Sequence, residues 1–210
     1  MQAAGIANVV TKAVKGFQAG GIVNYAGNLN GFQIGFINYA DTISKGLPIG
    51  FISVVRHGYR RVELEFNEAL FANLTFKTGT NRLYNIFSVG YRLKNDQTVW
   101  GVTYGLGTLL PVNKKFALNI DLTSTHLNEG EAWTSTVNSL NRLKVDGSFL
   151  LGKRTELFAG ISINVMASKL TDNEGRITGS ILTPDFSFYQ STIHWTRVTI
   201  YPGFNAGVRF

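Results

Sequence analysis

Apolar and polar residues alternate with a period of two along most of the chain, and helical periodicity is nearly absent. In the segment 116–123, Phe116, Leu118, Ile120 and Leu122 share one face, while Ala, Asn, Asp and Thr occupy the other. The same pattern recurs at 61–66, 87–93, 100–107, 142–151 and 157–165. Because successive side chains of a strand point to opposite faces, these segments are predicted to be two-faced β-strands. The chain is therefore expected to be all-β.

The first fifty residues carry an internal repeat that combines Gln, Gly, an aliphatic residue and Asn. Its final polar positions are Asn8, Asn24, Asn38 and Ser53, which lie 16, 14 and 15 residues apart. Each copy reads as a short strand followed by a polar turn, so the repeats are predicted to form hairpins. A β-solenoid with coils of about fifteen residues is the alternative for this segment.

The length and character of the strands favour a membrane-spanning sheet over a soluble β-sandwich. Alternation runs for about ten to thirteen residues, whereas soluble strands average about five or six and a tilted membrane strand needs about nine to eleven. The apolar registers carry no charge, which lipid contact requires because Lys or Arg at the bilayer midplane costs about 2–4 kcal/mol. We therefore predict a transmembrane antiparallel up-and-down β-barrel of about 12 strands, forming one domain over 1–210. Its parts are repeat-bearing hairpins at 1–55 and the remaining strands at 56–210. Strands are expected near 2–10, 17–26, 32–40, 47–55, 59–67, 70–78, 82–93, 97–108, 113–124, 140–151, 155–167 and 197–210.

The final strand ends on an aromatic residue, with Phe204, Val208 and Phe210 in one apolar register. In this feature the sequence resembles bacterial outer-membrane β-barrel proteins, whose last strand carries such a signal for the barrel-assembly machinery. The N-terminal Gln-x-Gly-aliphatic-x-Asn units are similar to surface repeats found among bacterial outer-membrane proteins. The resemblance implies the bacterial outer membrane as the location, its lipid and assembly machinery as partners, and Phe204, Val208 and Phe210 as the assembly signal. A surface protein partner of unknown identity is also compatible with it.

Charged residues of both signs fall on the registers opposite the apolar faces, and these are the predicted lumen-lining residues. They are Arg61, Glu63, Glu65, Lys77, Arg82, Arg92, Asp121, Arg142, Lys144, Asp146 and Arg209. Opposite charges either pair and fill a narrow interior or line a water-filled pore. The size of the predicted barrel favours the filled interior.

Composition narrows the classes of function further. The chain of 210 residues is 44% hydrophobic and 16% charged, and this composition excludes intrinsic disorder. It lacks Cys, which excludes disulfides and thiolate metal sites. The net charge of +7 is scattered, so nucleic acid is not an expected partner. No metal or cofactor site is predicted, because the histidines lack partners at ligand spacing. Met1 is followed directly by a strand-like repeat, so a secretory signal is expected to have been removed already.

One group of residues has the chemistry of a hydrolase. His126 lies near Ser124 and Glu129, and an outer-membrane hydrolase would place Ser, His and an acid at the outer rim. The favoured prediction is nevertheless a non-enzymatic integral outer-membrane protein, either a small channel or a structural or surface protein. The alternatives are a hydrolase acting on lipid or peptide through His126, and a soluble β-sandwich or solenoid binding module.

Overall fold

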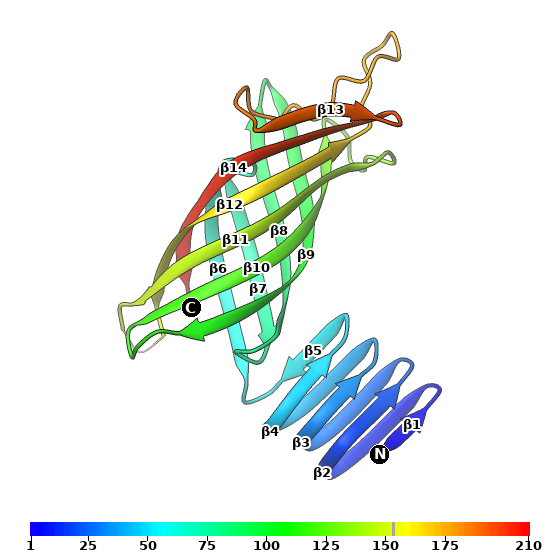
Figure 1. The fold of residues 1–210 in the computed structure, drawn as a ribbon, viewed down its shortest axis with the longest axis vertical. Helices are drawn as coiled ribbons and strands as arrows, with labels where there is room; N and C mark the ends of the chain where they lie inside the picture. The colour runs from blue at the N-terminus through cyan, green and yellow to red at the C-terminus, as the bar shows by residue number, and fades with distance from the viewer. Residues whose placement is uncertain (153) are drawn as a thin grey trace.

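The computed structural model describes residues 1–152 and 154–210, and every regular element in these ranges is a β-strand. The strands are β1 (Gln2–Ala4), β2 (Ala7–Gly20), β3 (Val23–Ile34), β4 (Ile37–Ile49), β5 (Ile52–Val55), β6 (Tyr59–Asn67), β7 (Ala72–Gly79), β8 (Tyr84–Lys94), β9 (Gln97–Pro111), β10 (Phe116–Glu129), β11 (Asn138–Leu150), β12 (Glu156–Ser168), β13 (Tyr189–Ile193) and β14 (Thr196–Arg209). They form two sheets, one of β1–β5 and one of β6–β14 (Figure 1).

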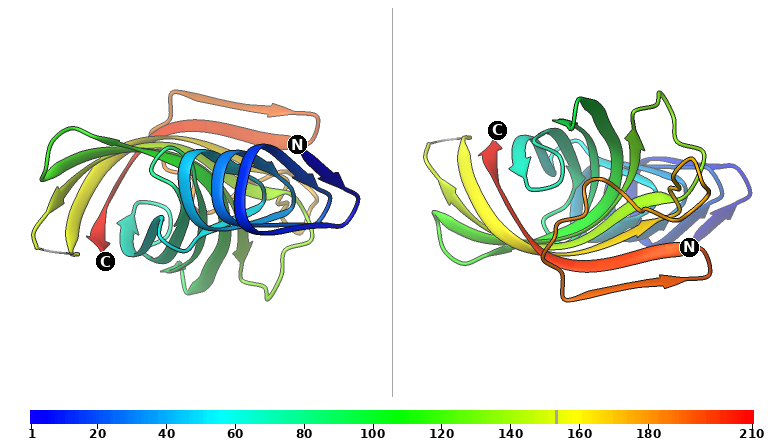
Figure 2. Two further views of the ribbon diagram at one scale, coloured as in Figure 1. Left: turned by 90° about the horizontal axis from the view of Figure 1, so that it is seen from below. Right: turned by 90° about the horizontal axis from the view of Figure 1, so that it is seen from above.

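This arrangement confirms the all-β class, but the prediction of one antiparallel barrel of about 12 strands over 1–210 is wrong. The first five strands form a sheet of their own, and all of their pairings are parallel. The repeats at 1–55 are therefore not hairpins. Seen end-on, this part of the chain winds as stacked coils (Figure 2), so residues 2–55 form a parallel β-solenoid.

Ladders of identical side chains explain why the repeats stack in parallel. The Asn24 side chain donates a hydrogen bond to Asn38 Oδ1 at 2.9 Å and accepts one from Asn8 Nδ2 at 3.0 Å. Gln33 donates to Gln18 Oε1 at 2.9 Å in a second ladder. Each buried amide satisfies the next one, and only in-register parallel strands bring identical repeat positions together. An antiparallel hairpin would separate them.

The unequal repeat spacings do not prevent this stacking, because irregularities in the strands absorb the difference. The register shifts between Val10 and Ala13 in the β2–β3 pair, and between Leu29 and Asn30 in the β3–β4 pair. Gly31 pairs with a glycine in both neighbouring coils and has a φ of 146°. A Cβ at this position would collide with the backbone of the preceding coil, so the close approach requires glycine.

The second sheet closes on itself. Its order is β12-β11-β10-β9-β8-β7-β6-β14-β13, and β12 also pairs with β14, so β6–β12 and β14 make a closed ring of eight antiparallel strands. We call this ring the closed sheet. The final strand β14 closes it: Asn205–Arg209 pair with Asn67–Glu63 of β6 on one side and with β12 on the other. Its first residues pair with β13, which lies outside the ring.

The two ends of the closed sheet differ. At the proximal end lie the turns 80–83 and 112–115, the C-terminal residue Phe210 and the link from the solenoid. At the distal end lie the connection 130–137 and the segment 169–188, which we call the distal loop. Figure 1 shows the solenoid below the closed sheet and the distal loop above it.

The solenoid packs against the outer surface of β8 and β9 through its last coil. The ring of Phe51 stacks on Tyr104 with 4.5 Å between ring centroids and meets Phe87 edge-on at 6.1 Å. Asn85 accepts a hydrogen bond from the Ser53 backbone N–H at 2.9 Å and donates to the carbonyls of Gly50 and Phe51. These contacts fix the last coil on the closed sheet.

Candidate functional site

The strand alternation of the closed sheet separates its chemistry into a polar inside and an apolar outside. Apolar side chains on all eight strands point outward and are 36–72% exposed. They are Val62, Leu64, Phe66, Leu74, Phe76, Val89, Tyr91, Leu93, Val102, Leu106, Leu118, Ile120, Leu122, Leu143, Val145, Leu157, Ile161, Ile163 and Phe204. Among the described residues, the outward registers carry no Asp, Glu or Lys, and their one Arg is Arg60 near the proximal end of β6. This is the reverse of a soluble protein, whose buried interior is apolar.

A network of ion pairs fills the proximal half of the interior. Lys77 Nζ lies 3.0 Å from Glu63 Oε1 and 2.7 Å from Asp121 Oδ2, and all three side chains are completely buried. Arg209 binds Glu63 through Nε and reaches Glu156 at 3.2 Å through a second nitrogen. The network joins β6, β7, β10, β12 and β14, so it links strands on opposite sides of the ring.

A second group of charges lies beside the first. Lys144 Nζ binds Glu65 Oε2 at 2.7 Å, and Asn205 donates to Asp146 Oδ1 at 2.8 Å. The buried Arg142 lies close to these groups along β11, and its Nε has no hydrogen-bond partner among the described residues. A cavity of about 10 Å³ remains among Glu65, Arg142 and Lys144 and their neighbours. Space for about one water molecule does not make an aqueous pore.

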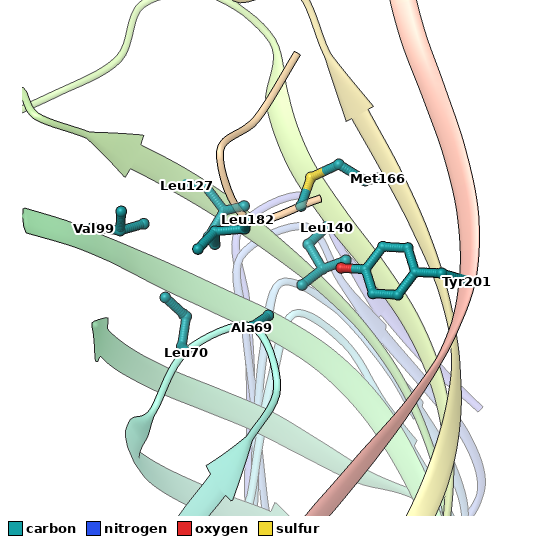
Figure 3. Close-up of a cluster of buried hydrophobic side chains, with 8 residues drawn as sticks. All are labelled: Ala69, Leu70, Val99, Leu127, Leu140, Met166, Leu182 and Tyr201. Atoms are coloured by element: carbon teal, nitrogen blue, oxygen red, sulfur yellow. The ribbon is translucent and has the colours of Figure 1, made fainter. Parts of the chain in front are cut away.

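The distal half of the interior is closed by apolar side chains, which Figure 3 shows. This cluster consists of Ala69, Leu70, Val99, Leu127, Leu140, Met166, Leu182 and Tyr201. Leu182 belongs to the distal loop, which therefore enters the mouth of the closed sheet. Glu129 holds the loop there: its carboxylate accepts hydrogen bonds from the Ser180 hydroxyl, from the Ile181 N–H at 3.0 Å and from Asn138 at 2.8 Å. Ion pairs and apolar side chains thus fill most of the interior, and a cavity of about 150 Å³ remains at the proximal mouth beside Tyr59, Arg61 and Glu156.

The structure places most of the predicted lumen residues on the inner face. Glu63, Glu65, Asp121, Arg142, Lys144, Asp146 and Arg209 are buried inside the closed sheet. Arg61 is at the proximal rim, where it reaches Glu156 at 3.3 Å, and Arg92 is at the distal rim, where it donates to the carbonyl of Ala69 at 3.1 Å. Arg82 is not a lumen residue. It is exposed in the turn 80–83, because β8 begins only at Tyr84.

Several polar residues that support the closed sheet were not identified from the sequence, and Glu156 of the ion-pair network is one of them. The buried Tyr84 hydroxyl donates to Asp121 Oδ1 at 2.6 Å, and Asn119 accepts from Arg209 at 3.0 Å. Glu68, in the connection after β6, accepts from the Phe204 N–H at 2.9 Å, next to the residues of β14 that pair with β6. Tyr84 and Asn119 share the inward register of charged neighbours, so alternation alone contains the signal for them. The position of Glu68 depends on which strands meet.

The hydrolase arrangement does not form. Ser124 and His126 share the outer face of β10, whereas Glu129 is on the inner face and binds the distal loop. The His126 ring packs on Trp133 at 4.7 Å, and its Nε2 is buried without a hydrogen-bond partner among the described residues. A nucleophile, base and orienting acid must form a chain of hydrogen bonds, and these three residues do not.

The residues of the predicted assembly signal lie on the outer face of the strand that closes the ring. Phe204 and Phe210 are 63% and 53% exposed, and Val208 is half-buried. The Phe210 N–H donates to the Val62 carbonyl at 2.9 Å, and the Val62 N–H donates back at 3.2 Å. The C-terminal residue therefore joins the last strand to β6.

The described residues contain no cluster of His, Asp and Glu arranged to hold a metal ion. No helix of sufficient length and hydropathy to cross a membrane occurs in the same residues. A scan of protein-family models, a search of curated proteins and a search of solved structures each found no match.

Proposed function

We propose that this protein is a non-enzymatic integral protein of the bacterial outer membrane, in which the closed sheet is the lipid-embedded anchor and the solenoid is the module it carries. One observation supports this proposal above all others: the closed sheet has charges inside and apolar side chains outside on all eight strands. Soluble monomers rarely expose contiguous apolar patches larger than a few hundred Å². A bilayer supplies the apolar surroundings that this outer face lacks in water.

The backbone also suits such surroundings. Every strand of the ring pairs with a neighbour on both sides, so no edge of the closed sheet is left without hydrogen bonds over its proximal half. In hydrocarbon each unpaired backbone group costs several kcal/mol, which is why only helices and closed sheets span membranes. The lengths of β9 and β10, 15 and 14 residues, exceed the roughly nine to eleven that a tilted strand needs.

Aromatic residues lie near both ends of the apolar band. Trp100, Tyr189 and Trp195 are near the distal end, and Phe116 and Phe149 pack at 4.8 Å near the proximal end. Girdles of aromatic rings at both membrane interfaces are typical of membrane-spanning closed sheets. This distribution supports a band of hydrocarbon between the two ends.

The filled interior favours a structural or surface role over a channel. Eight strands leave an interior just wide enough for side chains to fill, and here ion pairs and the apolar cluster fill it. In planar bilayers the protein is expected to give no steady conductance. Outer-membrane lipid would then contact the band, and the assembly machinery would read Phe204, Val208 and Phe210. A steady single-channel current would argue for the channel alternative instead.

Insertion can be tested with one charged substitution and a matched control. Ile161 is 72% exposed in the middle of β12, and Ile161→Arg is expected to cost about 2–4 kcal/mol of folding free energy in vesicles. Phe186→Arg in the distal loop, where the side chain is 66% exposed, is expected to change stability by less than about 0.5 kcal/mol. Equal effects at both positions, or a monodisperse folded protein in buffer without any amphiphile, would contradict the proposal.

A further inference from the structure

The solenoid exposes a row of apolar side chains along one of its corners. The corners are residues 4–6, 19–22, 34–36 and 49–51, where the chain passes from one coil to the next. Ile6, Ile22, Phe36 and Phe51 occupy equivalent corner positions and are 69%, 50%, 52% and 43% exposed. We call these four residues the corner row.

Backbone pairing holds the corner row in line. The Val23 N–H donates to the Ile6 carbonyl at 3.0 Å, and the Ile37 N–H donates to the Ile22 carbonyl at 2.7 Å. The rings of Phe36 and Phe51 stack with 5.1 Å between centroids. A shallow groove of about 850 Å³ runs beside the row, with Ala19, Ile34 and Ile49 among its lining residues. The apolar surface is therefore continuous from coil to coil.

The corner row joins the outer face of the closed sheet. Phe51 stacks on Tyr104 and meets Phe87, and both are outward residues of the closed sheet. Val89 and Val102 are the next outward residues on the same strands toward the distal end, and they belong to the apolar outer face. In Figure 1 the corners after β2, β3 and β4 are on the upper side of the solenoid, the side toward the closed sheet. The apolar band thus continues from the closed sheet onto the solenoid.

The charged residues of the solenoid lie away from the corner row. The charged residues of the solenoid strands are Lys12, Lys15, Asp41 and Lys45, and all of them lie outside the corners. An interfacial element needs an uncharged apolar side toward the acyl chains and a polar side toward water. The solenoid has both.

We infer that the corner row lies in the membrane interface, so that the solenoid rests along the bilayer surface and does not project away from it. The inference depends on the proposed insertion of the closed sheet. Lipid is the occupant that the continuity supports, because a bilayer around the closed sheet begins where Phe51 meets β8 and β9. Contact with lipid would also cover the exposed rings that a projecting solenoid would leave in water.

Single-tryptophan variants in reconstituted vesicles test this placement. Trp100, Trp133 and Trp195 are first replaced by Phe, and one Trp is then introduced by Phe36→Trp or Ile22→Trp. The vesicles contain phosphatidylcholine with or without bromine on the acyl chains, which quenches Trp only in the bilayer. Ile161→Trp serves as the reference for the closed sheet, and Lys45→Trp as the control on the charged part of the solenoid.

The outcomes separate the inference from the proposed function. Both corner variants are expected to lose a large share of emission, approaching the loss at Ile161→Trp, while Lys45→Trp loses none. If Ile161→Trp is quenched and the corner variants behave as Lys45→Trp does, the inference is wrong and the insertion of the closed sheet stands. No quenching at Ile161→Trp overturns both. Corner variants shielded from aqueous iodide but unquenched by bromine would show protein on the row, which also overturns the inference.

A second measurement remains decisive if the Trp-free background does not fold. The chain has no cysteine, so Phe36→Cys and Lys45→Cys each give one site for a nitroxide label with the native tryptophans in place. The label at Phe36→Cys is expected to relax faster with oxygen, which concentrates in lipid, than with a water-soluble nickel chelate. The label at Lys45→Cys is expected to show the reverse. The same preference at both sites would refute the inference.

Discussion

Replacing Lys77 by Met is the sharpest test of the interior ion network. Lys77 is completely buried and lies within 3.0 Å of both Glu63 and Asp121. Methionine has a similar length and is apolar, so Lys77→Met removes the charge with little change in volume. After the substitution Glu63 still pairs with Arg209. Asp121 still accepts a hydrogen bond from the Tyr84 hydroxyl.

The expected magnitude follows from the charge balance. The buried cations Lys77, Arg142, Lys144 and Arg209, together with Arg61 at the proximal rim, face the anions Glu63, Glu65, Asp121, Asp146 and Glu156, five against five. Removing Lys77 leaves one uncompensated buried carboxylate. Breaking a buried pair in this way costs about 3–5 kcal/mol, since the remaining charge is still desolvated. We expect a loss of this size in the free energy of unfolding.

The assay is urea unfolding of the reconstituted protein, followed by Trp fluorescence and extrapolated linearly to zero denaturant. Lys45→Met on the exposed part of the solenoid is the matched control and is expected to change the free energy by less than about 0.5 kcal/mol. The double variant Lys77→Met with Asp121→Asn removes one charge of each sign. It is expected to be more stable than Lys77→Met alone by about 0.5–3 kcal/mol.

Two results would refute this reasoning. A loss below about 1 kcal/mol for Lys77→Met would mean that water or a rearranged side chain compensates the carboxylates. If Asp121→Asn lowers the free energy of unfolding as much in the Lys77→Met background as it does alone, Lys77 and Asp121 act independently. Either result would show that the interior is not the closed network of charges described above.

Three further predictions concern the solenoid and the distal loop. Asn24→Ala breaks the amide ladder and is expected to lower the free energy of unfolding of the solenoid by about 1–3 kcal/mol, measured by thermal unfolding. Asn30→Ala, at an exposed position, is expected to change it little, and equal losses for the two variants would contradict the ladder. Glu129→Ala removes the acceptor that holds the distal loop and is expected to speed protease cleavage there severalfold, which unchanged digestion would disprove. Hydrogen bonds from the backbone and side chain of Arg176 lower the pKa of Asp172, so this turn is fully stabilised above the ordinary Asp pKa of about 4 and loses that contribution as the pH falls through the lowered pKa. A carboxyl titration followed by NMR is expected to show a smaller lowering of the Asp172 pKa in Arg176→Ala, which keeps the backbone hydrogen bond of residue 176 and loses only that of the side chain; an unchanged pKa would show that the side chain contributes nothing.

The repeats show where the sequence prediction failed and why. Asn8, Asn24 and Asn38 identify a repeat, but a strand has the same local geometry whether its neighbour is parallel or antiparallel. Each copy was interpreted as a strand followed by a polar turn, which favoured hairpins, and the repeat spacings of 16, 14 and 15 residues are unequal. Strand irregularities near Val10 and Leu29 absorb the difference instead. The recurring amides were the available signal, because buried Asn and Gln side chains satisfy one another only when identical positions stack.

The catalytic group shows a different limit. Ser124, His126 and Glu129 are close in sequence, but an odd separation in a strand places the acid on the other face. That fact was accessible from the alternation itself. The role of Glu129, in contrast, depends on where the distal loop folds, and a contact between Glu129 and Ser180 is set by the tertiary structure.

The amino-acid sequence by itself determined which side chains of each strand share a face, because the period of two is a property of the extended backbone. Val62 and Leu64 therefore had to oppose Glu63 and Glu65 wherever the strand was placed. Only the tertiary structure decided that the first five strands stack in parallel, that eight others close into a ring, and that Lys77 meets both Glu63 and Asp121. Such contacts join residues far apart in the chain, and they depend on strand order and register, which local side-chain patterns do not encode.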